Sequence, residues 1–166
     1  MKRRNFLQSM MGLALILFFP FATKGAALVQ KLNKSKTEWR ALLPRGRYEI
    51  LFEEATERAG SSALNRENRA GTFICAACHL PLFSSAQKYD SGTGWPSFWQ
   101  SLPNAVANRT DYKLIYPRTE YHCARCGGHQ GHVFDDGPSP TGLRYCNNGL
   151  ALEFIPEGAA LPALRT

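Results

Sequence analysis

Two C-x-x-C pairs constrain the fold of this chain more than any other feature. Cys75 and Cys78 form the first pair, Cys123 and Cys126 form the second, and 44 residues lie between them. A tight turn within each pair aims both sulfurs at one point, and two such turns together offer the four tetrahedral thiolates that Zn²⁺ accepts. Two disulfides are the alternative that an oxidising compartment would allow. We predict a structural zinc site, because four sulfur ligands leave the metal no open position for a substrate.

The first 27 residues have the layout of an export signal. A basic segment at residues 2–7 precedes an apolar run at 10–22, and small residues follow at 25–27. The paired arginines and the Phe-Leu that follows resemble a twin-arginine signal, and an ordinary secretory signal or an uncleaved membrane anchor are the alternatives. We therefore predict an exported protein, periplasmic in a Gram-negative cell. A polar linker is expected at residues 28–36, and a folded domain at 37–160.

The signal also carries much of the positive charge. The formal net charge of +7 falls to about +3 once the four lysines and arginines of residues 1–27 are set aside. The remaining basic residues are scattered among acidic ones and form no stripe along the chain. The sequence therefore gives little support for nucleic-acid binding.

The folded region is predicted to be mainly β, an antiparallel domain that follows two short helices. Thr37 can cap a helix at residues 38–43, and apolar spacing predicts a second helix at 48–59 that ends before Gly60. Residues 61–69 are polar and are expected to form a loop. Short apolar or alternating runs separated by Gly, Pro, Asn and Asp predict strands at residues 72–75, 113–116, 121–123, 132–134, 143–146 and 150–155.

The fifth cysteine, Cys146, lies outside both pairs. An unpaired cysteine in an exported protein suggests a reactive thiol, although a lone cysteine is often a small buried apolar residue. Arg144, two residues earlier, would share a strand face with Cys146 and favour its thiolate. Asn148, two residues later, could hold a substrate or a water molecule.

Two further motifs could contribute to a site. His129 and His132 directly follow the second cysteine pair and could donate a proton near neutral pH. Additional zinc ligands or structural hydrogen-bonding groups are the alternatives for these histidines. Trp95 belongs to an aromatic cluster in a loop constrained by Gly and Pro at residues 92–99. On its own, this cluster is as consistent with core packing as with a pocket wall.

Read in chain order, these motifs resemble one family. The order C-x-x-C, G-W-P-S-F, C-x-x-C, H-x-G-H-V-F, D-G-P and T-G-L-R-Y-C-x-N resembles the methionine-R-sulfoxide reductases, the B-type enzymes, from about residue 39 to residue 154. The resemblance implies two antiparallel sheets preceded by short helices. It also implies reduction of the R epimer of methionine sulfoxide in peptides and proteins, which repairs oxidative damage, although free methionine sulfoxide stays open as a substrate.

The resemblance assigns a role to each motif. Cys146 matches the nucleophile, which would become a sulfenic acid. His129 and His132 match the pair that contacts the sulfoxide oxygen or an ordered water. Trp95 matches the indole whose face receives the substrate methyl group, and the four paired cysteines match the zinc ligands.

Three other positions bear on the chemistry. Arg144 and Asn148 match polar residues that tune the thiolate and order the site. Thr93 departs from the family pattern, because many members have a resolving cysteine at this position. We therefore expect an external thiol reductant, thioredoxin-like or another, to reduce Cys146, and we expect the protein to act as a monomer. The rival hypotheses are a zinc-ribbon binding module with Cys146 in its core, and a peroxidase-like thiol enzyme on the same scaffold.

Overall fold

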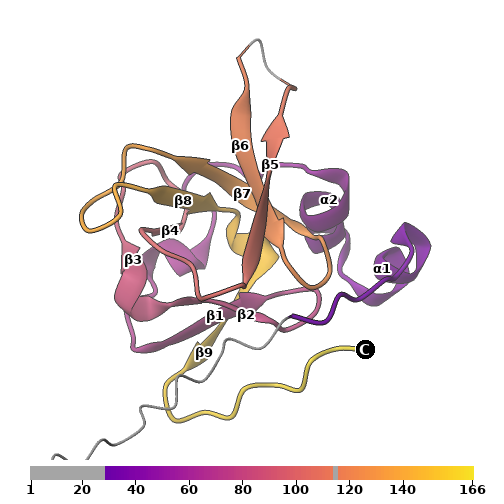
Figure 1. Ribbon diagram of the computed structural model, residues 1–166. Coiled ribbons are helices and arrows are strands. Elements are labelled where there is room, and N and C mark those ends of the chain that lie inside the picture. The colour runs from indigo at the N-terminus through magenta and orange to yellow at the C-terminus, as the bar shows by residue number, and fades with distance from the viewer. Residues whose placement is uncertain (1–28, 114–115) are drawn as a thin grey trace, which may run out of the picture.

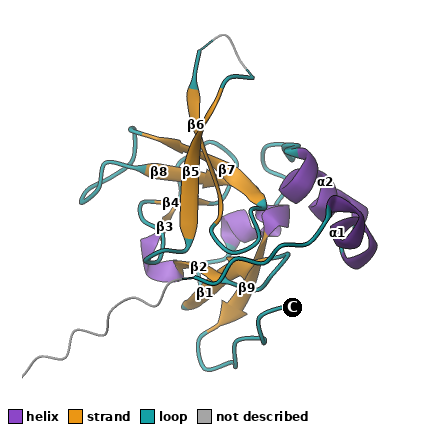
Figure 2. Cartoon of the chain, turned by 45° about the vertical axis from the view of Figure 1, so that its right-hand side comes forward, coloured by secondary structure: helices purple, strands orange, loops and turns teal. Residues whose placement is uncertain are grey.

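The structure is a computed structural model that describes residues 29–113 and 116–166. Within these residues, two α-helices precede nine strands arranged in two antiparallel sheets (Figures 1 and 2). The predicted fold class, mainly β with two antiparallel sheets after short helices, is confirmed. The predicted export signal at 1–27 lies outside the described residues. No described helix has both the length and the apolar character needed to cross a bilayer.

The first helix, α1, spans Lys36–Leu42 and begins one residue before the predicted cap. Ser35 is the N-cap: its side chain accepts a hydrogen bond from the Glu38 backbone, and the Glu38 carboxylate accepts one from the Ser35 backbone N–H at 2.8 Å. These two reciprocal hydrogen bonds satisfy the backbone N–H groups of Glu38 and Ser35, which would lack these partners if Thr37 were the cap. The prediction of Thr37 as the cap was therefore wrong, and α1 begins inside the segment predicted as a linker.

The second helix, α2, spans Arg45–Glu53, so it begins three residues before the predicted helix at 48–59 and ends six residues before the predicted end. It ends because Glu54 adopts a left-handed conformation with φ of 55°. The Glu54 carboxylate is bound by Arg109 and Lys113, which belong to a distant part of the chain. The segment after Glu54 instead forms hydrogen bonds with Asn148 and with the indole of Trp95. A short 3₁₀ helix at Ala63–Arg66 occupies part of the predicted loop at 61–69.

The smaller sheet has the order β2-β1-β9. Its strands are β1 (Gly71–Cys75), β2 (Pro81–Ser84) and β9 (Leu152–Pro156). The predicted strand at 72–75 is confirmed as β1. The strand predicted at 150–155 begins later, because a 3₁₀ helix at Gly149–Ala151 precedes β9. Strand β2, which contains a proline and lies at the edge of this sheet, was not predicted.

The larger sheet has the order β3-β4-β8-β7-β6-β5. The strands predicted at 121–123, 132–134 and 143–146 are confirmed as parts of longer or shifted strands. The strand predicted at 113–116 is wrong, because residues 113 and 116 lie between strands and residues 114–115 are outside the described part. The bounds are β3 (Lys88–Tyr89), β4 (Ser97–Phe98), β5 (Val106–Asp111), β6 (Arg118–Cys123), β7 (His129–Phe134) and β8 (Arg144–Asn147).

An aromatic core fills the space between the two sheets. Phe83 stacks on Phe98 with ring centroids 4.2 Å apart, and Phe73 meets Phe98 edge-on at 5.0 Å. Tyr121 and Tyr145 contribute a further edge-on pair at 5.1 Å. Each such pair adds about 1 kcal/mol beyond its buried area. Because side chains alternate along a strand, the neighbours of these core residues project from the opposite face of the larger sheet.

Candidate active site

Strand register places a row of polar side chains on the outer face of the larger sheet. Ser97 pairs with Cys146, Cys146 with His132, His132 with Glu120, and Glu120 with Arg109. Directly paired residues of antiparallel strands lie on the same face, with Cβ atoms about 5 Å apart. The row therefore aligns a thiol, an imidazole, a carboxylate and a guanidinium across five strands.

A β-bulge brings the second histidine to the same face. Residues three apart in a regular strand face opposite sides of a sheet. The pairing of β7 with β6 runs from Tyr121 with Gly131 to His122 with His129, and Gln130 is left as the extra residue. The rings of His129 and His132 consequently lie 5.6 Å apart between centroids. Sequence alternation alone would have separated these two rings.

Cys146 lines a pocket of about 160 Å³. Trp95 and Phe134 contribute apolar surface to this pocket, whereas His132 and Asn148 contribute polar groups. Four of the site residues predicted from the sequence thus line one pocket: Trp95, His132, Cys146 and Asn148. The pocket can hold a small group with one apolar and one polar side next to the thiol.

Gly131 explains how β7 and β8 approach each other beside Cys146. A Cβ atom at this position would lie 1.9 Å from the carbonyl oxygen of Cys146 and 3.2 Å from the Cα of Asn147. No side chain fits there, so only glycine allows the two strands to pair at this point. The glycine of the H-x-G-H motif is therefore a structural requirement of the site.

The Cys146 thiol experiences opposing influences. Burial raises its pKa, and the positive charge of Arg144 together with the nearby Thr93 hydroxyl offsets part of this effect. The net pKa lies above the usual value, so the free thiol is protonated at neutral pH. Arg144 is held in place by Asp136 through two hydrogen bonds of 2.8 Å and by the ring of Phe134, 4.3 Å from its guanidinium carbon.

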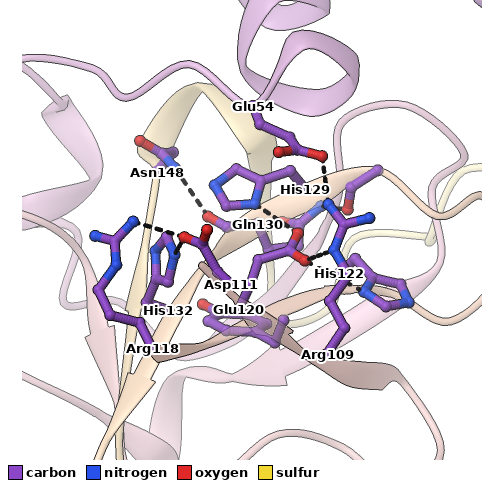
Figure 3. A network of polar contacts seen from close by, with 12 residues as sticks. Glu54, Arg109, Asp111, Arg118, Glu120, His122, His129, Gln130, His132 and Asn148 are labelled. Atoms are coloured by element: carbon purple, nitrogen blue, oxygen red, sulfur yellow. Dashed lines mark hydrogen bonds and ion pairs between the residues drawn. The ribbon is translucent and has the colours of Figure 1, made fainter. Parts of the chain in front are cut away.

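His129 is connected to a buried carboxylate (Figure 3). Its Nδ1 lies 2.7 Å from Glu120 Oε1, and both side chains are almost completely buried. Arg109 donates to the other oxygen of Glu120 and also to Glu54. Burial raises the pKa of Glu120, but the hydrogen bonds and charges of His129 and Arg109 outweigh it and leave the pKa below the usual value.

His132 is connected to a second carboxylate in the same view (Figure 3). Its Nε2 lies 2.8 Å from Asp111 Oδ2, which also accepts a hydrogen bond of 2.6 Å from Arg118. The backbone N–H of Lys113 donates to the other Asp111 oxygen at 2.9 Å. The backbone donor, followed by His132 and Arg118, holds the pKa of Asp111 far below its usual range.

Sequence reasoning missed these two carboxylates and the arginines that bind them. Arg118 and Glu120 stand two residues apart directly before the second cysteine pair, a spacing that puts both on one face of a strand. The predicted strand begins only at residue 121 and therefore does not include Arg118 or Glu120. Asp111 ends a strand whose side chains are mostly exposed and polar, and nothing in that pattern marks it.

The segment after α2 ties Trp95 and Asn148 to the pocket. The indole N–H of Trp95 donates to the Glu57 carbonyl at 3.2 Å. Asn148 accepts a hydrogen bond from the Glu57 backbone N–H and donates to the Gln130 carbonyl, both at 3.1 Å. The Glu57 carboxylate in turn accepts from the backbone N–H groups of Gly149 and Leu150. Both predicted side chains are therefore fixed by hydrogen bonds rather than free to rotate.

The four paired cysteines form a cluster at the ends of β1 and β6. Their sulfurs all lie within 4.8 Å of one another, and three of the four residues are buried. The Sγ atoms of Cys75 and Cys126 are 3.7 Å apart, and those of Cys78 and Cys123 are 3.6 Å apart. A disulfide needs about 2.05 Å, whereas tetrahedral sulfurs at about 2.3 Å from Zn²⁺ lie about 3.8 Å from each other. The cluster is therefore close enough to bind a metal ion and has the spacing of a tetrahedral sulfur site.

Comparison with known proteins gives concordant matches. A family model described as "SelR domain" matches residues 43–156. A protein of Pseudomonas putida (strain W619) named "Peptide methionine sulfoxide reductase MsrB" is 46% identical over 135 residues, which cover 80% of this chain and 100% of that protein. Proteins with the same name from Leptospira interrogans (48% identical; 76% of this chain, 98% of the relative) and Thiobacillus denitrificans (51% identical; 75% and 95%) are also similar.

Proposed function

Because the chain belongs to the SelR-domain family of MsrB proteins, we propose that it reduces methionine sulfoxide residues in oxidised peptides and proteins to methionine. We further propose that it acts on the R epimer, with Cys146 as the nucleophile. The observation that carries this proposal is the small pocket that Cys146 lines together with Trp95, Phe134 and His132, its direct partner across the strands.

The residues around the thiol support a proton-coupled attack. A sulfoxide sulfur is a poor electrophile until its oxygen is protonated or strongly hydrogen-bonded, and an imidazolium can supply that proton. An imidazole near the thiol would first take its proton, so that the thiolate attacks sulfur while the proton passes to the oxygen. The S–O bond of the substrate breaks as its oxygen passes to the Cys146 sulfur, so the substrate sulfur is reduced by two electrons and Cys146 is oxidised by two electrons to a sulfenic acid.

The two walls of the pocket support selection of one epimer. Trp95 and Phe134 offer apolar surface for the methyl group, whereas His132 and Asn148 offer polar groups for the oxygen. A sulfoxide sulfur carries three different substituents and a lone pair. Fixing the methyl at the apolar residues and the oxygen at the polar ones therefore leaves one configuration whose sulfur faces the thiol. Arg144 contributes by lowering the pKa of the thiol against the effect of burial.

The return to the thiol requires an external reductant. Position 93 holds a threonine rather than a cysteine, and the other cysteines lie in the sulfur cluster. We propose that one external thiol condenses with the sulfenic acid, releasing water, and that a second thiol releases Cys146 and leaves as a disulfide. A thioredoxin-like dithiol protein would supply both thiols.

The sulfur cluster is proposed to hold structural Zn²⁺. All four ligands come from the protein, so the metal would join the ends of β1 and β6 and take no part in the reaction.

Export through the N-terminal segment 1–27, with the domain reaching an oxidising compartment, is also proposed. Folding before export would allow the thiols to bind metal before they meet oxidants. Fusion of residues 1–27 to a reporter that is active only outside the cytoplasm tests this route, and exchange of Arg3 and Arg4 for lysine should abolish its export.

The activity is tested with the separated epimers of a methionine sulfoxide peptide. The metal-loaded full chain is incubated with each epimer and dithiothreitol, and methionine formation is followed. We expect turnover of the R epimer alone, and loss of that turnover in Cys146→Ser, which should keep its metal and its melting temperature. No turnover by folded, metal-loaded protein would refute the proposed function. Trapping an intramolecular disulfide to Cys146 after one turnover would refute the proposed external reductant.

A further inference from the structure

The two histidines of the site bind their carboxylates through different nitrogens. His129 uses Nδ1 toward Glu120 Oε1, whereas His132 uses Nε2 toward Asp111 Oδ2. The ring nitrogens that remain for the reaction are therefore Nε2 in His129 and Nδ1 in His132. Nδ1 is bonded to Cγ, the ring atom that carries Cβ. It therefore lies on the part of the ring that is closest to the strand.

The Asp111 carboxylate determines which nitrogen of His132 carries hydrogen. Asp111 is ionised at neutral pH because its pKa is held far below the usual range. An ionised carboxylate only accepts hydrogen bonds, so the Nε2 atom 2.8 Å away must carry a proton in the neutral ring. Nδ1 is then the basic nitrogen. Among residues 29–113 and 116–166, no group forms a hydrogen bond with it.

Asp111 is itself fixed by two donors. Arg118 donates to Oδ2 at 2.6 Å, and the Lys113 backbone N–H donates to Oδ1 at 2.9 Å. Both side chains are nearly buried: 9% of the Asp111 side chain and 15% of the His132 side chain are exposed. Both oxygens are therefore held, and the orientation of the His132 ring follows from them.

The partner of His132 on the next strand is Cys146, whose thiol is protonated at neutral pH. We propose that Asp111 is a positioning residue for sulfoxide reduction: it holds His132 in the Nε2–H tautomer, so that Nδ1 relays the proton of Cys146 to the sulfoxide oxygen. This inference rests on the proposed function and selects His132 rather than His129 as the relay. It also assigns a role to a residue that no sequence motif marked.

Protons and electrons balance in this step. Nδ1 takes the thiol proton, and the resulting imidazolium is stabilised by the negative charge of Asp111. The thiolate attacks the sulfoxide sulfur and forms an S–S bond, and the imidazolium returns the proton to the oxygen. The hydroxyl group then passes to the Cys146 sulfur: the S–O bond of the substrate breaks, an S–O bond to Cys146 forms, and the S–S bond breaks. Methionine leaves with its sulfur reduced by two electrons, while the sulfenic acid of Cys146 carries both the oxygen and the proton. His132 ends the step neutral, as it began.

The charged and titratable groups around His132 come from four strands. Asp111 lies on β5, Arg118 and Glu120 on β6, His129 on β7, and Cys146 on β8. Burial lowers the pKa of His132, and Asp111 opposes this both as a hydrogen-bond acceptor and as a charge. Arg118 and His129 lower the pKa further. Loss of the Asp111 charge should therefore make the imidazolium harder to form.

The test compares Asp111→Asn with a matched control in the metal-loaded full chain. Glu67→Gln is the control, because among the described residues the Glu67 carboxylate forms hydrogen bonds with Arg69 alone and none with His132. In Asp111→Asn we expect kcat at pH 7 to fall about tenfold or more, since a positioned proton relay contributes at least about 100-fold. KM should change less than about twofold, and the basic limb of the kcat profile should shift to lower pH. Asp111→Glu should recover part of kcat.

The tautomer is measured directly by ¹⁵N NMR of histidine-labelled protein, at a pH where His132 is neutral. We expect Nε2 to be protonated in the wild type and in Glu67→Gln, and a mixture of tautomers in Asp111→Asn. A wild-type His132 protonated at Nδ1 overturns the inference even if the variant fails to fold. If the wild type is active and Asp111→Asn has the same kcat and pH profile, the inference about Asp111 is overturned and the proposed function stands. If the wild type is inactive, the proposed function is refuted as well.

Discussion

Replacing Gly131 with alanine should disrupt the site by separating two strands. The added Cβ would lie 1.9 Å from the carbonyl oxygen of Cys146, whereas an ordinary carbon–oxygen contact is about 3.3 Å. Strands β7 and β8 would have to move apart by about 1.4 Å at this point. A ladder hydrogen bond of about 2.9 Å would then exceed about 4 Å and be lost.

The stability cost follows from the groups left unpaired. Each buried backbone group without a partner costs about 1–3 kcal/mol, so the loss beside Gly131 amounts to about 3 kcal/mol. A domain of this size loses about 3 °C of melting temperature per kcal/mol, which predicts a decrease of about 10 °C. Because the clash displaces the backbone of Cys146 itself, a shift near 1 Å should also lower kcat/KM about 100-fold.

A matched substitution separates this clash from the general effect of adding a methyl group. Gly46 lies in α2, and its added Cβ would be 3.6 Å from Leu150, an ordinary contact. Gly46→Ala should leave activity unchanged and raise stability by about 0.5 kcal/mol, because alanine loses less backbone entropy in a helix. Both variants are followed by thermal unfolding and by turnover of the sulfoxide peptide. A Gly131→Ala protein that melts within about 2 °C of wild type would refute the reasoning.

Three further predictions concern the pocket, the metal and pH. Trp95→Ala should raise KM and reduce epimer preference while the fold is kept, as measured with the separated epimers; full preference in the variant would exclude Trp95 from selection. Removal of metal by a chelator should release one zinc ion per chain and lower the melting temperature, because the sulfur cluster joins the two sheets; metal loss without destabilisation would contradict a structural role. The pKa values of Asp111 and Glu120 are lowered from 3.8 and 4.5 in the folded protein. Their stabilising effect should therefore be complete above these values and decrease as the pH falls below about 4, and an unfolding free energy that stays constant between pH 5 and pH 2 would contradict this.

The cysteine pattern by itself was sufficient to predict the sulfur cluster. Each C-x-x-C pair needs only a local turn to bring its two sulfurs together, and the chemistry of four thiolates then implies one site. Strands β1, β6, β7 and β8 could also be predicted in part, because local alternation and turn residues decide them. The family motifs contain Cys146 and three of the residues that line a pocket with it, namely Trp95, His132 and Asn148.

Other features depended on contacts between distant segments. Helix α2 stops at Glu54, which binds Arg109 and Lys113 of another part of the chain, so helical periodicity overestimated its length. Strand β5 is polar and mostly exposed, and it exists because it pairs with β6 along its full length. No local pattern reports either interaction.

The sequence by itself determined which chemical groups this protein has, and the tertiary structure decided how they face one another. The spacing of His129 and His132 would place them on opposite faces of a regular strand, and a bulge at Gln130 brings them together. The partners of these histidines, Glu120 and Asp111, come from strands whose register only the folded sheet defines. Hydrogen bonding between strands is non-local, and for that reason the orientation of these side chains is a property of the fold rather than of any motif.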